Sequence, residues 1–413
     1  MRPEQCTPEQ IRACHGDVTE HPCCEPTHPC RPAPLARRLT ELAILFLKLG
    51  TISFGGPAGH VALMEHEAVQ KRKWLSREHF LDLVAATNLV PGPNATEMAI
   101  HIGYARAGWL GLVVSGAAFI LPAFFITLAL AWAYAQYGSL PQAGAILYGV
   151  KPAVVAIIVM AVWRLGRSAV VNRTTAVFFA LALLATFSAT DDLALMVAAG
   201  LLMVLWQQRT RLPWFGLLAI GWQAPLALPV LGKATDSRLV QLFLYFLKIG
   251  SILYGSGLVL YAFIQRDVVA GFGWLSQQQL IDAIAAGQIT PGPVLSSATF
   301  IGYLIAGVPG AAVATLGVFL PSFVIVALIG PWIPRLRNWQ FGKAFLQGAT
   351  IAALALIFKV GFLLGRSALI DVWSVLIALA SIVLIWRYKA DAIWVIGGGA
   401  VVGFLRLLVS GSI

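Results

Sequence analysis

The sequence has 413 residues, of which 59% are hydrophobic and only 11% charged, and its mean hydropathy is +0.80. Soluble domains carry roughly a quarter charged residues, so this composition excludes an ordinary soluble protein and predicts an all-α polytopic membrane protein. The net charge of +11 does not predict a nucleic-acid partner, because the basic residues form short clusters between apolar segments. A basic excess suits an anionic substrate better than a cationic one.

Residues 1–38 are rich in Pro, His, Cys and charge, and we expect them to form a disordered cytoplasmic tail. All five cysteines lie in this tail, and the run from His21 to Cys30 concentrates soft metal ligands. Its spacing matches no standard zinc module, so we assign no metal site. Metal or thiol sensing by the tail stays open as an alternative. We expect no secretory signal peptide, because the first apolar run begins only near Leu39.

After the tail, the sequence repeats at a fixed offset. The run Phe46-Leu47-Lys48-Leu49-Gly50 returns 200 residues later as Phe246-Leu247-Lys248-Ile249-Gly250, and Pro91-Gly92-Pro93 returns as Pro291-Gly292-Pro293. From Ile102 onward the offset is 199. We therefore predict a first unit at 39–210, a linking transmembrane segment at 211–239 and a second unit at 240–413.

Each unit begins with two apolar segments that contain helix-incompatible residues. The first segment of unit one breaks at Gly55-Gly56-Pro57, which corresponds to residues 254–257, and the second segment of each unit breaks at its Pro-Gly-Pro triplet. Four unbroken apolar segments follow in each unit. Hydropathy thus counts about 13 hydrophobic segments, which we interpret as about nine full spans and about four re-entrant hairpins.

The distribution of Lys and Arg predicts the orientation of the units. Unit one has basic clusters at 71–77 and 164–173, whereas unit two has them near Arg337 and at 387–389, on the opposite turns of the repeat. Cytoplasmic loops carry an excess of Lys and Arg. All clusters can be cytoplasmic only if the second unit is upside down, which is the inverted-repeat plan of many secondary transporters.

Lys48 and Lys248 occupy equivalent positions inside apolar segments, just before the first break of each unit. A charge within the membrane costs at least roughly 2.5–3.5 kcal/mol on insertion scales, so it indicates a functional site. We predict that both lysines face a cavity and contact the substrate. The alternative is a lysine that extends to the membrane interface.

The Pro-Gly-Pro breaks should leave half-helix N-termini near mid-membrane, where the N–H groups and the helix dipole favour anions. In unit one Asn88 precedes the triplet and Asn94 follows it. In unit two the residue that corresponds to Asn94 is the apolar Val294. The first site is therefore the more polar, although a structural kink is the alternative. Glu97 could carry a coupling proton or neutralise a nearby cation, and His60 is expected to be a structural hydrogen-bonding residue.

Two runs together resemble the signatures of the chromate ion transporter (CHR) superfamily: Phe46-Leu47-Lys48-Leu49-Gly50-Thr51-Ile52-Ser53-Phe54-Gly55-Gly56-Pro57, and Leu89-Val90-Pro91-Gly92-Pro93-Asn94-Ala95-Thr96-Glu97. The duplicated length resembles its long-chain bacterial members. The resemblance implies chromate efflux across the bacterial inner membrane, driven by the membrane potential or an ion gradient, and hence chromate resistance. The sequence contains no zincin His-Glu-x-x-His, P-loop or Gly-x-Ser-x-Gly motif, so we expect neither an enzyme nor a cofactor.

The predicted substrate contacts are therefore Lys48, Gly55, Gly56, Pro57, Asn88, Pro91, Gly92, Pro93, Asn94, Lys248, Pro291, Gly292 and Pro293, with Glu97 as the coupling residue. Sulfate has nearly the shape and charge of chromate, so it stays open as the substrate or as a competitor. A membrane-embedded metal sensor that uses the tail is the alternative from another class. The other partners expected are the lipid bilayer and, left open, a second copy of the chain in a homodimer.

Overall fold

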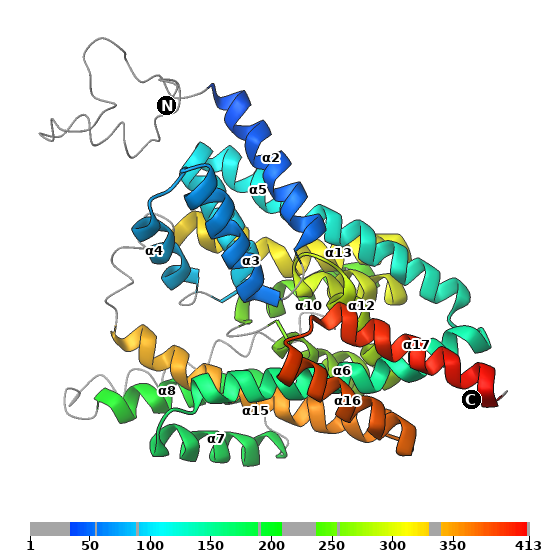
Figure 1. The fold of residues 1–413 in the computed structure, drawn as a ribbon. Coiled ribbons are helices and arrows are strands. Elements are labelled where there is room, and N and C mark those ends of the chain that lie inside the picture. The colour runs from blue at the N-terminus through cyan, green and yellow to red at the C-terminus, as the bar shows by residue number, and fades with distance from the viewer. Residues whose placement is uncertain are drawn as a thin grey trace, which may run out of the picture.

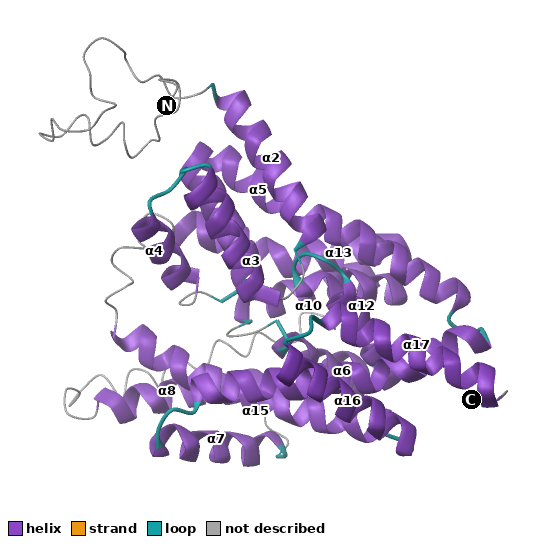
Figure 2. Ribbon diagram, viewed as in Figure 1, coloured by secondary structure: helices purple, strands orange, loops and turns teal. Residues whose placement is uncertain are grey.

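The computed structural model describes residues 34–53, 56–87, 91–188, 191–208, 237–253, 257–329 and 340–410. Nearly all of the predicted tail (1–38) and of the predicted linking segment (211–239) falls outside these ranges. The described residues form helices and short connections without any strand, as Figure 2 shows. The all-α prediction is therefore confirmed for this part of the chain, while the exact boundaries of the units remain predictions.

The helices occur in the same order in both halves of the chain. The first half contains α2 (Leu35–Ile52), α3 (Gly56–Glu65), the π-helical turn η1 (His66–Lys71), α4 (Arg77–Thr87), α5 (Asn94–Tyr137), α6 (Pro141–Ala169), α7 (Arg173–Thr186) and α8 (Asp192–Gln208). The second half contains α10 (Arg238–Ile252), α11 (Val259–Phe263), η3 (Ile264–Gly271), α12 (Gln277–Ile289), η4 (Val294–Ser296), α13 (Ser297–Ile329), α15 (Gln340–Ala368), α16 (Val372–Tyr388) and α17 (Ala392–Ser410).

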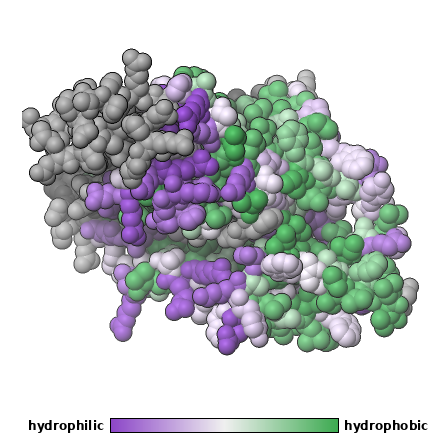
Figure 3. Space-filling model, turned by 45° about the horizontal axis from the view of Figure 1, so that its top comes forward, coloured by the Kyte–Doolittle hydropathy of each residue, from purple (hydrophilic) through white to green (hydrophobic). Residues whose placement is uncertain are grey.

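Five of the described helices are long and apolar enough to cross a membrane: α5, α6, α13 with η4, α15 and α17. The helices α7, α8 and α16 are apolar but shorter. Large apolar side chains such as Phe125, Leu184 and Trp394 are exposed, and Figure 3 shows hydrophobic residues over much of one side of the molecule. Apolar patches of this extent mark a membrane surface, so the chain is a multi-pass membrane protein. The count of about 13 segments remains a prediction.

The helices form two groups, which lie above and below each other in Figure 1. In the first group, which holds the broken segments, α2 packs on α5, α10 packs on α13, and α5 and α13 pack on each other. The second group joins α6 to α15, α16 and α17, and it joins α15 to α7 and α8. The short helices α11 and α12 bridge the groups, because α11 contacts α15 and α12 contacts α6 and α17.

Three pairings have a counterpart in the repeat: α2–α5 with α10–α13, α6–α17 with α15–α8, and α6–α16 with α15–α7. Glycines mark the closest approaches. Gly149 of α6 faces Gly399 of α17 so closely that a Cβ on Gly149 would lie 1.9 Å from the Gly399 carbonyl oxygen. At the equivalent crossing, a Cβ on Gly348 of α15 would lie 2.2 Å from the carbonyl oxygen of Ala199 in α8. Small residues let membrane helices approach this closely. The last helix of each half, α8 or α17, thus packs against a helix of the other half.

Sharp turns divide α5 and α13 into a short half-helix and a long helix. In α5 the turn lies at Ala107 and Gly108, where Gly108 has φ 64°, and in α13 it lies at Ala306 and Gly307. Glycine adopts this left-handed conformation without steric cost. The half-helix from Asn94 to the turn therefore folds back along the longer part of α5. The expected re-entrant hairpins at the Pro-Gly-Pro breaks remain a prediction.

Candidate substrate cavity

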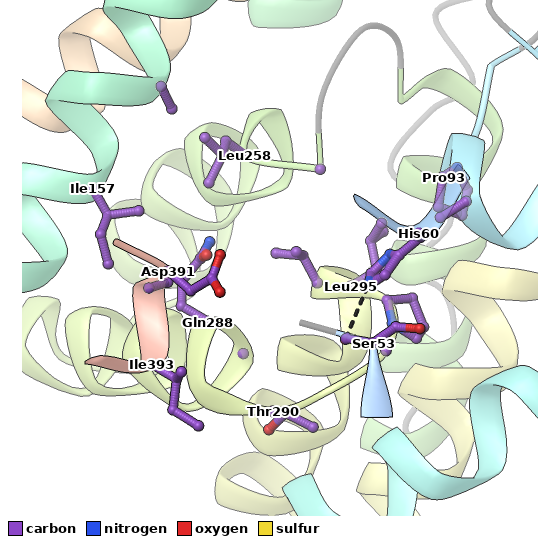
Figure 4. A pocket seen from close by; sticks show the side chains of 18 of the residues that line it. Ser53, His60, Pro93, Ile157, Leu258, Gln288, Thr290, Leu295, Asp391 and Ile393 are labelled. Atoms are coloured by element: carbon purple, nitrogen blue, oxygen red, sulfur yellow. Dashed lines mark hydrogen bonds between the residues drawn. The ribbon is translucent and has the colours of Figure 1, made fainter. Parts of the chain in front are cut away.

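A cavity of about 450 Å³ lies between the two groups of helices, at the point where the broken segments meet. Figure 4 shows Gln288 and Asp391 on one wall and His60 and Pro93 on the other. The walls come from both halves of the chain and from helices as distant in sequence as α2 and α17. The polar or backbone-contributing residues of the lining are Ser53, His60, Gly92, Pro93, Asn94, Arg164, Gln288, Thr290, Gly292, Pro293, Lys389 and Asp391.

The two Pro-Gly-Pro triplets are held at the cavity by hydrogen bonds that cross between the units. The Gly92 amide donates to the Leu253 carbonyl at 2.8 Å, and the Gly292 amide donates to the Ser53 carbonyl at 3.0 Å. Ser53 and Leu253 end α2 and α10, where carbonyls lack partners within the helix. Each triplet therefore caps the broken helix of the opposite unit, and these two glycine amides are not available to a substrate.

The N-terminus of α5 lies at the cavity. Its N-cap residue, Pro93, provides no side-chain hydrogen bond, and both Pro93 and Asn94 line the cavity. The first N–H groups of a helix have no partners within the helix and carry a partial positive charge. This end of α5 can therefore donate hydrogen bonds to an anion.

Two cations from different units also line the cavity. Arg164 comes from α6, and Lys389 ends α16 in the left-handed conformation, with φ 53°. Both side chains are exposed, so the cavity opens to the outside of the protein at this end. Asp391 follows Lys389 on the same rim. Together these groups leave the rim with an excess of one positive charge.

Sequence reasoning used Arg164 and Lys389 only as markers of orientation and missed them as cavity residues. A signal was present, because both belong to basic clusters that the inverted arrangement places on one side of the membrane. The sequence alone does not show that the helices with these two clusters pack around the same cavity.

His60 hydrogen-bonds through Nε2 to the Ser53 carbonyl at 3.0 Å, and its side chain is 2% exposed. It therefore fixes the end of α2 beside the cavity. The structural role expected for His60 agrees with this contact.

Glu97 lies directly behind the cavity wall. The residue is fully buried, and neither carboxylate oxygen has a hydrogen-bond partner among the described residues. A Cβ placed on Gly92 would lie 2.0 Å from Glu97 Oε1 and 2.9 Å from Ser322 Oγ. Only the backbone of a glycine thus separates this carboxyl group from the cavity.

Lys48 lies away from the cavity lining in the described part of the chain. Its side chain is half exposed, and Nζ lies 3.3 Å from Glu67 Oε1. Lys71 and Arg72 also approach Glu67, each at 3.4 Å. Burial alone would raise the pKa of Glu67, but the hydrogen bonds and charges of Lys48, Arg72 and Lys71 outweigh it and hold that pKa below its ordinary value. The substrate contact predicted for Lys48 remains a prediction.

The second unit has a lysine and a carboxylate at the equivalent positions. Lys248 is exposed, and its positive charge acts on the carboxylate of Asp267, which stands 200 residues after Glu67. Sequence reasoning noted the repeated lysines but not the repeated carboxylates. The offset between Glu67 and Asp267 was the signal that would have revealed the pairs.

The structure thus brings together Gly92, Pro93, Asn94, Gly292 and Pro293 from the predicted site. Gly55 and Asn88 lie outside the described residues, and of Gly56 and Pro57 only the position in the first turn of α3 is described. Pro91 and Pro291 lie in the two breaks next to the lining residues. Within the described ranges, no group of three or more His, Cys, Asp or Glu side chains could hold a metal ion.

Two segments of the chain match a known protein family. The family model "Chromate transporter" matches the chain twice, at residues 40–205 and 240–404. A "Probable chromate transport protein" from Synechococcus elongatus is 34% identical over 85% of this chain and 91% of its own length. The "Chromate transport protein" of Cupriavidus metallidurans is 33% identical over 89% of this chain and 93% of its own length. No solved structure matches the chain. The chain therefore belongs to the chromate transporter family.

Proposed function

We propose that this protein exports chromate from the cytoplasm across the bacterial inner membrane and so gives chromate resistance. The observation that carries the proposal is the cavity at which both Pro-Gly-Pro triplets, Arg164 and Lys389 meet. Chromate is a tetrahedral dianion, which suits a cavity with two cations and a helix N-terminus. The relatives named as chromate transport proteins over most of their length support the choice of substrate.

The direction of transport follows from electrostatics. A membrane potential that is negative inside favours the exit of anions by roughly 2.3 kcal/mol per charge per 100 mV. A dianion gains twice this amount, so export requires a selective path rather than a large energy input. The potential is therefore our proposed driving force.

The inverted arrangement of the units is part of the same proposal, and contacts between equivalent helices support it. Tyr148, near the start of α6, donates to Asp371 Oδ2, just beyond the end of α15, at 2.6 Å. Arg406, near the end of α17, lies 3.0 Å from the same carboxylate group. The equivalent helices α6 and α15 therefore run in opposite directions. The rim with Arg164 and Lys389 then faces the cytoplasm, where it can admit the anion.

We assign Glu97 the coupling role. A charged carboxylate behind Gly92 would repel a dianion in the cavity, whereas the neutral acid would not. Occupation of the cavity by the oxyanion and of Glu97 by a proton should therefore favour each other. Lys48 and Lys248 are retained as proposed contacts on the route of the substrate towards the cavity.

Inverted membrane vesicles test the proposal directly. Vesicles that contain the protein should take up chromate when the potential is established and stop when an ionophore abolishes it. Excess sulfate should compete, because it is also a tetrahedral dianion. Vesicles in which chromate uptake equals that of empty vesicles would contradict the function.

The metal-sensor alternative depends on the tail, which lies outside the described residues. A chain without residues 1–36 separates the two functions. Chromate uptake that survives this deletion supports transport by the helical part, while complete loss in a chain that still inserts supports the sensor.

A further inference from the structure

Two threonines from different units meet at the lining of the cavity. Thr290, after the end of α12, lines the cavity, and its Oγ1 accepts a hydrogen bond from Thr127 Oγ1 of α5 at 3.2 Å. Thr127 is fully buried and Thr290 is 5% exposed. This contact joins the first unit to the second.

The same two helices form a second polar contact beyond the threonines. Tyr134 of α5 donates from Oη to Asp282 Oδ2 of α12 at 2.9 Å. From Thr127 to Tyr134 the helix advances by about 10 Å, and α12 runs back from Thr290 to Asp282 over a similar distance. The two contacts therefore lie in line, in the direction that leads away from the cavity.

A lysine is present on α6, the helix that packs on α12. Lys151 stands between Val150 and Pro152 in the apolar helix α6, and its positive charge acts on the Asp282 carboxylate. Asp282 is 3% exposed, and its Oδ1 atom has no hydrogen-bond partner among the described residues. On α6, Lys151 lies about 20 Å before Arg164, towards the opposite end of the helix. The cation is therefore well separated from the open rim.

Thr290, Thr127, Tyr134, Asp282 and Lys151 form what we call the polar track. Its counterpart in the repeat keeps the carboxylate, as Asp82, but differs at the positions of Thr127 and Lys151. At the offset of 199 residues, Thr127 corresponds to the buried Val326 and Lys151 corresponds to Thr350. The fold therefore does not require the hydroxyl at position 127 or the charge at position 151. The buried hydroxyl at 127 and the lysine at 151 are thus present in the first unit and not at the equivalent positions of the second.

We propose that this track is the exit route of the oxyanion, with the Thr127–Thr290 contact as its closed gate and Lys151 as a second anion-binding residue beyond the gate. The proposal rests on the proposed function, because it concerns the path of the same substrate. When the gate opens, the dianion replaces Asp282 as the partner of Lys151. The carboxylate stays nearby on Tyr134, repels the anion and so prevents the site from retaining it. Conduction requires this combination of attraction and weak retention.

A disulfide across the gate tests the first part. All five natural cysteines lie in the first thirty residues, so they can be replaced by serine without changing a described residue. In that background, T127C/T290C should cross-link under oxidation, since the two side-chain oxygens lie 3.2 Å apart. We expect oxidation to lower chromate flux by about tenfold or more and reduction to restore it, while chromate still binds.

The matched control is T299C/T315C, since those hydroxyls lie 2.8 Å apart within the α13 hairpin and do not join the two units. Its flux should be the same in oxidised and reduced form. A cross-linked T127C/T290C that transports as fast as its reduced form would overturn the gate. Failure of the unmodified protein to transport chromate would instead contradict the proposed function, so the two failures are distinguishable.

Substitution of Lys151 tests the second part. We expect K151M to lower flux by about tenfold while equilibrium chromate binding changes by less than about twofold, because the cavity itself is intact. The control is K343M, which removes an exposed lysine near the start of α15 and should leave flux unchanged. K151M with the flux of the unmodified protein would overturn the second anion-binding site, as would equal losses of flux and binding.

Discussion

The two Pro-Gly-Pro breaks share a backbone arrangement but differ in the chemistry behind it. Gly92 and Gly292 have φ values of 150° and 92°, and each donates to the end of a helix in the opposite unit. Behind Gly92 lie the carboxyl group of Glu97 and the hydroxyl of Ser322, whereas the nearest atoms to a Cβ on Gly292 would be Ala123 Cβ and the Gly50 carbonyl oxygen. Both copies thus keep the hydrogen bond from the triplet glycine to the opposite unit, but only the first copy has the titratable Glu97.

Substitution of the two glycines should give the largest difference between the breaks. In G92A the new Cβ would lie 2.0 Å from Glu97 Oε1, while in G292A the closest atoms would lie at 3.1 Å. Both variants also carry the strain of a non-glycine residue at positive φ, which costs about 1–3 kcal/mol. We expect G92A to abolish chromate flux and G292A to retain a measurable part of it.

Protein recovered in the membrane and thermal stability in detergent serve as controls for this pair. In G92A/E97A the clash with the carboxylate is removed, so the amount of inserted protein should rise towards that of G292A. Equal flux and equal stability in G92A and G292A would show that the two breaks do not differ in this way.

Substitution of Arg164 or Lys389, the two cations at the rim of the cavity, should give the second-largest effect. Hydrogen bonds to charged groups are worth about 1.5–3 kcal/mol, so R164Q should weaken chromate binding by at least about tenfold. K389N should have a comparable effect, and asparagine tolerates the left-handed conformation of this residue. The control R167Q removes the arginine that stacks on Trp163, outside the cavity lining. Equilibrium binding of chromate is the measurement, and a loss in R167Q equal to that in R164Q would remove Arg164 from the site.

Substitution of Glu97 should change the pH dependence of chromate binding more than it changes the transport rate. Its charged form opposes the dianion behind Gly92, so chromate binding should weaken as rising pH removes the proton from Glu97. E97Q stays neutral and should bind chromate with little dependence on pH. Binding is best measured above neutral pH, where chromate is itself a dianion. A wild-type profile as flat as that of E97Q would exclude the coupling role.

Lys48 should give the smallest effect. Interactions of an exposed charge such as Lys48 contribute about 0–1 kcal/mol, so loss of the proposed substrate contact in K48M should lower chromate flux by about threefold. Flux in K48M equal to that of the unmodified protein would remove Lys48 from the substrate route. Comparison of K48M with K248M shows whether the lysines act alike in the two units, and flux in vesicles is the readout.

Much of the architecture could be predicted because it depends on local sequence. Proline and glycine mark the breaks at Pro91–Pro93 and Pro291–Pro293, and the fixed offset reveals the two copies. The cavity was harder to predict from the sequence, because its residues meet only after α6, α16 and α17 pack together. Arg164 and Lys389 therefore could be assigned to a side of the membrane but not to a cavity. Lys48 stood out as an unusual charge, but its partner Glu67 lies on a helical turn whose direction the sequence does not fix.

The hydrogen bonds from Gly92 to Leu253 and from Gly292 to Ser53 also bear on how such a chain can evolve and assemble. Since each copy ends a helix that the other copy completes, neither half can build the cavity alone. Two separately expressed halves should therefore be inactive apart and regain transport when produced together. Once the copies had diverged at Glu97 and Ser297, two identical halves could no longer reproduce the arrangement, so the duplicated gene became dependent on both of its parts.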